Sequence, residues 1–192
     1  MDATPPKTPA TPLCGRDDPA PFVVLEERGP APTLIVCDHA SRAFPQAVDR
    51  LGLPELPSWQ HIAWDIGAGE LARGLAHMLG APAVLAGYSR LVVDCNRSPG
   101  DEEAFRKESD GWTVPGNQQL TEDDRRVRLA SFFDPYHECI EAMLAGFRGR
   151  GVVPLLVAVH SFSPTLAGST RPWHAGVLWD RDEANAQRLL EG

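Results

Sequence analysis

The sequence lacks the features that mark membrane, secreted and nucleic-acid-binding proteins. No apolar run is long enough to cross a bilayer, and the first residues contain no apolar segment of the kind found in signal peptides. Lys and Arg total 18 against 26 Asp and Glu, which gives a net charge of -8, and no long basic cluster interrupts this acidic balance. We therefore expect a soluble cytoplasmic protein that binds neither nucleic acid nor a membrane.

Cysteine is also scarce. The four cysteines stand far apart and form no CxxC pair, so the sequence predicts neither a zinc ribbon nor a disulfide scaffold. The composition is otherwise that of an ordinary globular protein, with 192 residues of which 43% are hydrophobic and 23% charged. Residues 1–21 are rich in Pro, Thr, Ala and Asp and are predicted to be a disordered tail, followed by a single domain over 22–192.

Short apolar runs alternate with helical patterns along the rest of the chain. Runs typical of buried strands occupy 33–37, 83–86, 91–95, 155–160 and 175–179. Between them, helices are predicted over 66–79, over 121–147 with Pro135 as a kink or a break, and over 182–190. The apolar stripe of the first helix consists of Ile66, Leu71, Leu75, Met78 and Leu79. This order predicts an α/β fold whose sheet is covered on both faces.

Two histidines stand at the ends of two of these apolar runs. His39 ends the sequence Leu34-Ile-Val-Cys-Asp-His39, and His160 ends Leu155-Leu-Val-Ala-Val-His160. Because function in an α/β sheet collects at the carboxyl ends of strands, the two imidazoles could share one metal ion. The alternative is a pair of unrelated histidines that cap their strands through backbone hydrogen bonds.

A carboxylate completes this candidate metal site. Asp65 precedes the first predicted helix, where it could serve as the N-cap or as a third metal ligand. Sequence spacing does not separate the two roles. His61, in the same segment, could bind substrate or could simply be solvated.

A group of polar residues lies in and around the run at 91–95. Arg90 precedes this run, Asp94 lies near its end, and Asn96 and Arg97 follow it. An Arg fork binds a carboxylate through two parallel hydrogen bonds, so these residues predict a small acidic ligand. Alternatively, Asp94 could pair with Arg97 and brace the turn.

Together, these motifs resemble the N-formylglutamate amidohydrolase family. The resemblance covers most of the chain from residue 22 and rests on these blocks: Val36-Cys-Asp-His39-Ala-Ser, His61-Ile-Ala-Trp-Asp65-Ile-Gly, Tyr88-Ser-Arg-Leu-Val-Val-Asp-Cys-Asn96-Arg97, Val159-His160-Ser-Phe and Arg171-Pro-Trp-His174. It implies a three-layer α/β/α sandwich around a mixed, mostly parallel sheet, similar to the zinc carboxypeptidases and aspartoacylase. It also implies zinc-dependent hydrolysis of an amide on a small acidic N-acyl amino acid such as N-formylglutamate.

The resemblance also implies roles for individual residues. His39, Asp65 and His160 would ligate zinc, and Arg90, Asn96, Arg97 and Arg171 would bind the substrate. Two departures stand out: Arg42 occupies the glutamate position of the HxxE pair of related carboxypeptidases, and family members continue past residue 192. Their later segment carries a glutamate that resembles the general base. We therefore expect either a truncated or shortened member of the family, or one in which another, unidentified carboxylate has taken this role.

Two rival functions remain open. An acidic-ligand-binding protein that has lost hydrolysis fits the missing glutamate. A serine hydrolase that uses Ser161 or Ser89 is weaker, because the sequence contains no GxSxG motif.

Overall fold

The computed structural model describes residues 13–55, 60–166 and 169–191. The chain divides into two units, residues 1–162 and residues 163–192. The predicted single domain over 22–192 stays a prediction. Within the described residues, no helix is both long and apolar enough to cross a membrane.

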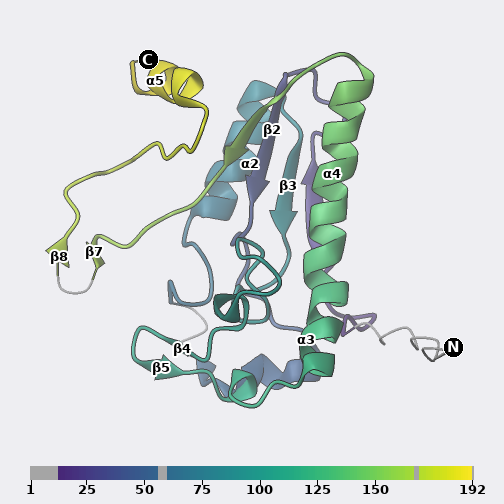
Figure 1. Ribbon diagram of the computed structural model, residues 1–192, viewed down its shortest axis with the longest axis vertical. Coiled ribbons are helices and arrows are strands. Elements are labelled where there is room, and N and C mark those ends of the chain that lie inside the picture. Colours follow the sequence, from purple (N-terminus) through teal and green to yellow (C-terminus); the bar gives the residue numbers. More distant parts are fainter. Residues whose placement is uncertain (1–12, 56–59, 167–168, 192) are drawn as a thin grey trace, which may run out of the picture. The chain divides into compact units, whose positions relative to one another are not determined.

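A four-stranded sheet forms the centre of the first unit (Figure 1). Its strands are β1 (Phe22–Leu25), β2 (Thr33–Cys37), β3 (Ala83–Ala86) and β6 (Leu155–Ala158), in the order β1-β3-β2-β6. β2 pairs in parallel with both β3 and β6, and β1 runs antiparallel to β3. The sheet is therefore mixed and mostly parallel, as predicted.

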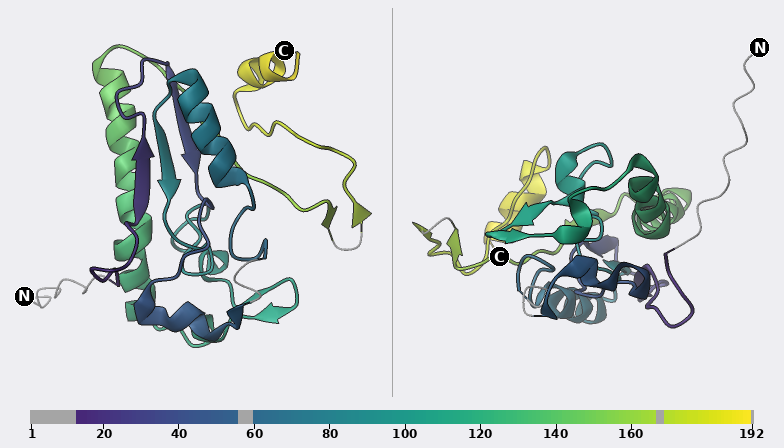
Figure 2. Two further views of the ribbon diagram at one scale, coloured as in Figure 1. Left: turned by 180° about the vertical axis from the view of Figure 1, so that it is seen from behind. Right: turned by 90° about the horizontal axis from the view of Figure 1, so that it is seen from below.

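Two helices cover opposite faces of this sheet, as Figures 1 and 2 show. Ile35 and Cys37 of β2 pack with α2 (Ala68–Leu79), whereas Leu34 and Val36 pack with α4 (Asp134–Gly149). Because alternate residues of a strand face opposite sides, a single strand contributes to both cores. The predicted three-layer α/β/α sandwich is confirmed.

Helix α2 presents an unexpected face to the sheet. The residues packed in the core are small, Ala68, Ala72 and Ala76, together with the partly buried Leu75. The other members of the predicted stripe are exposed: Ile66, Leu71, Met78 and Leu79. Of the predicted stripe, only Leu75 packs against the core, and the small alanine side chains of the buried face allow a close approach to the strands.

The helical segment after Thr121 is continuous through Pro135. It contains α3 (Glu122–Arg128), a π-helical turn (Leu129–Phe133) and α4, whose first turn accommodates Pro135. Thr121 caps α3 through a reciprocal pair of hydrogen bonds with Asp124. A π-helical turn therefore replaces the predicted kink or break.

The predicted strand over 91–95 is not formed. These five residues are buried but follow turns rather than a strand. Side chains satisfy their carbonyl groups in place of a neighbouring strand: Asn117 Nδ2 donates to Leu91 O at 2.9 Å, and Arg128 Nη1 donates to Val92 O at 3.1 Å. The apolar pattern correctly indicated burial, but an irregular segment rather than a strand carries it.

The remaining elements are short. In the first unit they are 3₁₀ segments at Gln46–Gly52, Glu102–Phe105 and Pro115–Asn117, and a two-stranded pair of β4 (Glu108–Ser109) and β5 (Trp112–Thr113). The second unit contains β7 (Thr165–Leu166) paired with β8 (Ser169–Thr170), and α5 (Glu183–Glu191). The predicted strand over 175–179 is wrong, because these residues have no regular secondary structure.

The predicted tail falls only partly on described residues, since residues 1–12 lie outside them. Residues 13–21 hydrogen-bond to the sandwich: Leu13 N donates to Ser131 Oγ at 3.0 Å, and Gly87 N donates to Pro21 O at 2.8 Å. This segment therefore belongs to the folded unit.

Candidate metal centre

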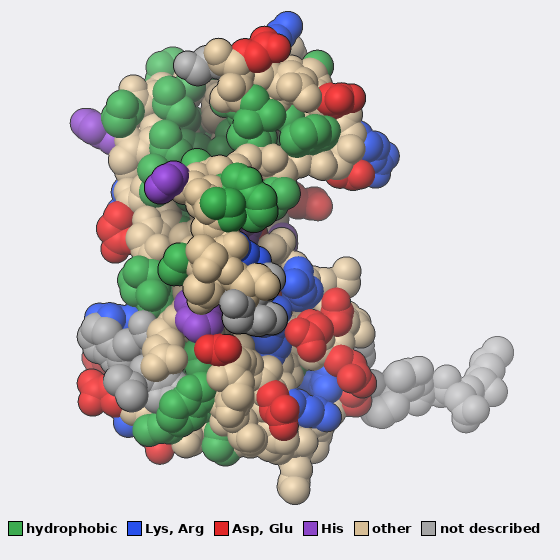
Figure 3. All heavy atoms as spheres, turned by 90° about the vertical axis from the view of Figure 1, so that its left-hand side faces the viewer, with side chains coloured by type: hydrophobic (Ala, Val, Ile, Leu, Met, Phe, Trp, Pro, Cys, Tyr) green, Lys and Arg blue, Asp and Glu red, His purple; other side chains and the backbone are tan. Residues whose placement is uncertain are grey.

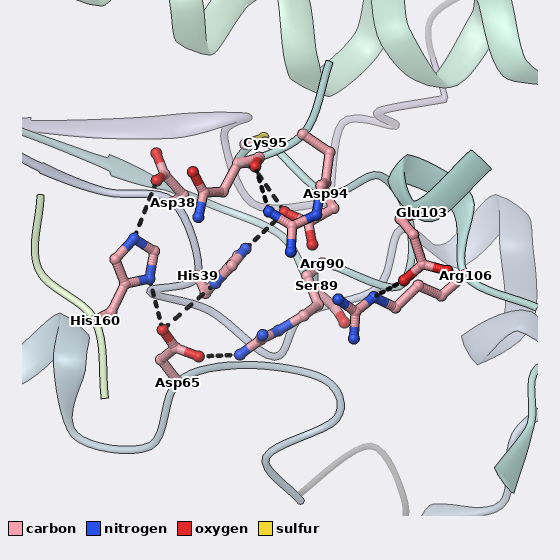
Figure 4. A network of polar contacts seen from close by, with 12 residues as sticks. Asp38, His39, Asp65, Ser89, Arg90, Asp94, Cys95, Glu103, Arg106 and His160 are labelled. Atoms are coloured by element: carbon pink, nitrogen blue, oxygen red, sulfur yellow. Dashed lines mark hydrogen bonds and ion pairs between the residues drawn. The ribbon is translucent and has the colours of Figure 1, made fainter. Parts of the chain in front are cut away.

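Three residues from different parts of the first unit converge at one end of the sheet (Figure 4). His39 follows β2, His160 follows β6, and Asp65 lies in the turn before α2. One nitrogen of each imidazole and one Asp65 oxygen lie within 4.8 Å of one another. The parallel pairing of β2 and β6 places the two histidines side by side, since their strands end at the same edge.

Asp65 Oδ2 faces Nδ1 of both histidines. Asp65 Oδ2 lies 2.8 Å from His160 Nδ1 and 3.4 Å from His39 Nδ1. Ligand atoms of a tetrahedral zinc ion, with bonds of ~2.0–2.1 Å, are separated by about 3.3 Å. Two imidazoles and one carboxylate are a donor set typical of zinc, so these residues fit the implied metal in chemistry and spacing.

Asp65 does not cap α2 with its side chain. Gly67 occupies the N-cap position, in a left-handed conformation that glycine readily adopts. The second oxygen of Asp65, Oδ1, forms an ion pair with Arg90 Nη2. Burial lowers the pKa of Arg90 to about 10, so this side chain remains a cation at neutral pH. Of the two roles left open for Asp65, the structure therefore favours the one in which it faces the histidines.

His39 is held from behind by a second carboxylate. Its Nε2 lies 2.7 Å from Asp94 Oδ1, and both side chains are buried. Burial lowers the pKa of His39, and the hydrogen bond to Asp94 only partly opposes this effect. Burial also disfavours the charge on Asp94, but hydrogen bonds from His39 and from the Asn96 amide hold the pKa of Asp94 below its usual range. His39 therefore tends to be neutral, with Nδ1 free to bind a metal.

His160 has a comparable partner in Asp38. Its Nε2 lies 3.4 Å from Asp38 Oδ2, and Tyr136 donates a hydrogen bond of 2.6 Å to Asp38 Oδ1. Burial disfavours the Asp38 charge, but these two partners and the nearby imidazoles keep the pKa of Asp38 below its usual range. Each histidine thus has a carboxylate behind it, and sequence reasoning identified neither as a partner of a histidine.

The predicted substrate residues are arranged in three different ways. Arg90 pairs with Asp65. Asn96 and Arg97 are exposed, and Arg97 Nη1 donates to Asn96 O at 3.0 Å. Asp94 does not pair with the Arg97 side chain, and no ion pair links Arg97 to a carboxylate of the described residues. Arg171 lies in the second unit.

The other polar candidates lie outside the group of three. His61 is exposed and lies 3.4 Å from Asp110, and His77 is exposed on α2. Ser89 is fully buried and donates its hydroxyl hydrogen to Ala63 O at 2.8 Å, which leaves it without access to a substrate. Ser161 contributes its backbone N–H, 3.3 Å from Asp65 Oδ2.

On the face drawn in Figure 3, acidic and basic side chains of the described residues are interspersed over the lower half.

Comparison with known proteins places the chain in a family. Residues 31–192 match the family model of N-formylglutamate amidohydrolase. An N-formylglutamate deformylase from Pseudomonas aeruginosa is 29% identical over 149 residues. The match covers 72% of this chain and 55% of the relative. The chain therefore spans about half the length of this curated relative.

A solved structure has a similar fold. The crystal structure of a gene product from Agrobacterium tumefaciens superposes with a TM-score of 0.90 at 32% sequence identity, covering 93% of this chain and 71% of that one. Since the family model matches most of the chain, the protein belongs to the N-formylglutamate amidohydrolase family.

Proposed function

We propose that the chain is a zinc-dependent amidohydrolase, which removes a formyl or other small acyl group from an acidic N-acyl amino acid such as N-formylglutamate. The observation that carries this proposal is the convergence of His39, Asp65 and His160, each with its ligand atom facing the others. Family membership and the name of the P. aeruginosa relative support the reaction and the substrate class.

A zinc ion bound at this site would polarise the amide carbonyl and lower the pKa of a bound water. The protein's own contribution is to fix the ligands. Asp94 and Asp38 orient the two imidazoles, and the ion pair with Arg90 fixes Asp65. Such partners behind the ligands preserve the geometry that a catalytic metal requires.

Substrate recognition is proposed for Asn96 and Arg97. Asn96 and Arg97 lie two and three residues after Asp94, and Asp94 contacts His39. Both are exposed and lie close in sequence to a residue that contacts a proposed metal ligand. A guanidinium can bind a substrate carboxylate through two parallel hydrogen bonds. Arg90 is occupied by Asp65, so we assign it to ligand orientation, and Arg171 remains a candidate for substrate binding.

A second candidate is a protein that binds the acidic ligand without hydrolysing it. A general base needs a carboxylate free to accept a proton. The three carboxylates of this network already have partners: Asp38 contacts His160 and Tyr136, Asp94 contacts His39, and Asp65 contacts Arg90. These pairings are the observation that supports a binding protein as the second candidate.

One set of measurements separates the two candidates. Zinc content is measured by elemental analysis, and ligand binding is measured by calorimetry. Turnover is measured as formate release from N-formyl-L-glutamate with and without added zinc. Zinc-dependent turnover that is lost in His39→Ala and kept in His77→Ala, the exposed histidine control, supports the hydrolase. Binding without turnover supports the second candidate, and the absence of both zinc and binding would refute the two together.

A further inference from the structure

The two histidines of the metal centre are held to different degrees. His39 is buried and lies 2.7 Å from Asp94. His160 follows β6, which lies at the edge of the sheet and pairs with β2, and its side chain is 33% exposed. An exposed imidazole after an edge strand has more rotational freedom than a buried one. His160 therefore depends more strongly on the side chain behind it.

That side chain is Asp38, the residue before His39. Asp38 is buried, and its two oxygens face different partners: Oδ2 lies 3.4 Å from His160 Nε2, and Oδ1 accepts the hydroxyl hydrogen of Tyr136 at 2.6 Å. Asp38 lies in the turn that follows β2, and there it reaches the histidine at the end of the neighbouring strand rather than His39. Without Tyr136, the Asp38 carboxylate would lose the partner that fixes its rotation.

Tyr136 reaches Asp38 from the first turn of α4, directly after the π-helical turn. It is fully buried, and the next residue, His137, donates from Nε2 to Cys95 O at 3.0 Å. One helical turn thus contacts both segments that carry a carboxylate behind a histidine: the turn after β2, which holds Asp38, and the segment from Asp94 to Arg97. π-helical turns frequently occur near functional sites, which fits this placement.

We propose that Tyr136 and Asp38 are positioning residues, which fix the ring of His160 so that its Nδ1 faces Asp65 and the metal. With a metal bound at Nδ1, the ring proton would lie on Nε2, which faces Asp38 Oδ2 at 3.4 Å. Tyr136 fixes the carboxylate, so helix α4 sets the geometry of a ligand that it does not itself carry. This inference rests on the proposed metal site.

Two variants test the relay, with a matched tyrosine control. Tyr136→Phe removes one hydroxyl from a buried ring, and Asp38→Ala removes the carboxylate. Tyr88→Phe is the control, because Tyr88 is also buried and its hydroxyl hydrogen goes to Pro19 O rather than to the metal centre. Zinc affinity is measured by competition with a chromophoric chelator. The ring tautomer of His160 in the metal-free protein is measured by ¹⁵N NMR.

We expect Asp38→Ala to weaken zinc binding by roughly 10–100-fold, the range for partners of metal-ligating histidines. Tyr136→Phe should weaken it by roughly 3–10-fold, equivalent to one net hydrogen bond. In the metal-free protein, the His160 ring lies between Asp65 Oδ2, 2.8 Å from Nδ1, and Asp38 Oδ2, 3.4 Å from Nε2. Both variants of the relay should therefore shift the ring proton towards Nδ1, compared with the wild type and Tyr88→Phe.

The two measurements separate failure of the relay from failure of the metal site. An unchanged tautomer together with unchanged zinc affinity in Tyr136→Phe and Asp38→Ala would overturn the inference. If the wild type binds no zinc, but the His160 tautomer still differs between the wild type and the two variants of the relay, the proposed metal site is refuted and the positioning of His160 stands. If Asp38→Ala does not fold, Tyr136→Phe alone decides, since it preserves the ring that packs in the core.

Discussion

Asp94 offers the most direct test of how the site binds its metal. Its side chain is 1% exposed and lies 2.7 Å from His39 Nε2, and it also accepts the Asn96 amide at 2.9 Å. Asp94→Asn retains the shape and one acceptor oxygen but removes the charge. We expect zinc affinity to fall by roughly 10–100-fold, which corresponds to about 1.4–2.8 kcal/mol. A hydrogen bond to a charged group contributes about 1.5–3 kcal/mol, so the two magnitudes agree.

The stability of the metal-free protein should change less than its zinc affinity. The asparagine still accepts a neutral hydrogen bond and no longer opposes burial as a charge, so we expect a loss of about 0.5–1.5 kcal/mol. Zinc affinity is measured by chelator competition, and stability by urea unfolding without metal. Asp124→Asn is the control, because Asp124 is an exposed carboxylate in the cap of α3. Wild-type zinc affinity in Asp94→Asn would refute the proposed orienting role.

The parallel core of the fold could be predicted because burial on both faces leaves a simple pattern. The apolar runs at β2, β3 and β6 were identified correctly, since a strand covered by helices contains few polar positions. The run at 91–95 is equally apolar but is no strand, because the side chains of Asn117 and Arg128 supply its hydrogen bonds. Hydrophobicity predicts burial, but it does not predict which groups satisfy the backbone.

The same limit applies to the site. The positions of His39 and His160 at strand ends gave a testable prediction that they converge, and the structure brings them together with Asp65. The roles of Asp38 and Asp94 were missed, because each contacts a histidine that is distant in sequence or on a neighbouring strand. The register of β2 and β6 brings Asp38 to His160, and the irregular segment at 91–95 brings Asp94 to His39. The sequence does offer one signal for both residues: Asp38 follows the apolar run at 33–37, and Asp94 lies near the end of the run at 91–95.

Three further predictions concern ligand binding, thiol reactivity and acid stability. Arg97→Lys keeps the charge but loses the two-pronged geometry, so calorimetry should show a loss of about 1.5–3 kcal/mol for N-formylglutamate and little change for N-formylglutamine amide; equal losses for both would contradict the clamp. Iodoacetamide should label the partly exposed Cys14 before Cys37, since burial raises the pKa of Cys37 to about 12, and mass spectrometry showing early labelling of Cys37 would contradict this. The metal-free protein should lose stability as the pH falls below 6.5, because burial, only partly opposed by Asp94, lowers the pKa of His39 from 6.5 in the folded state. The unfolded chain then binds the proton first, so this contribution is fully present above pH 6.5 and is lost as the pH falls towards the folded pKa. The free energy of unfolding is measured by urea unfolding between pH 7 and about pH 5. His39→Gln should reduce its dependence on pH, whereas His77→Gln, at an exposed position of α2, should retain it. The same slope in all three proteins would show that the buried imidazole of His39 does not govern stability in this range.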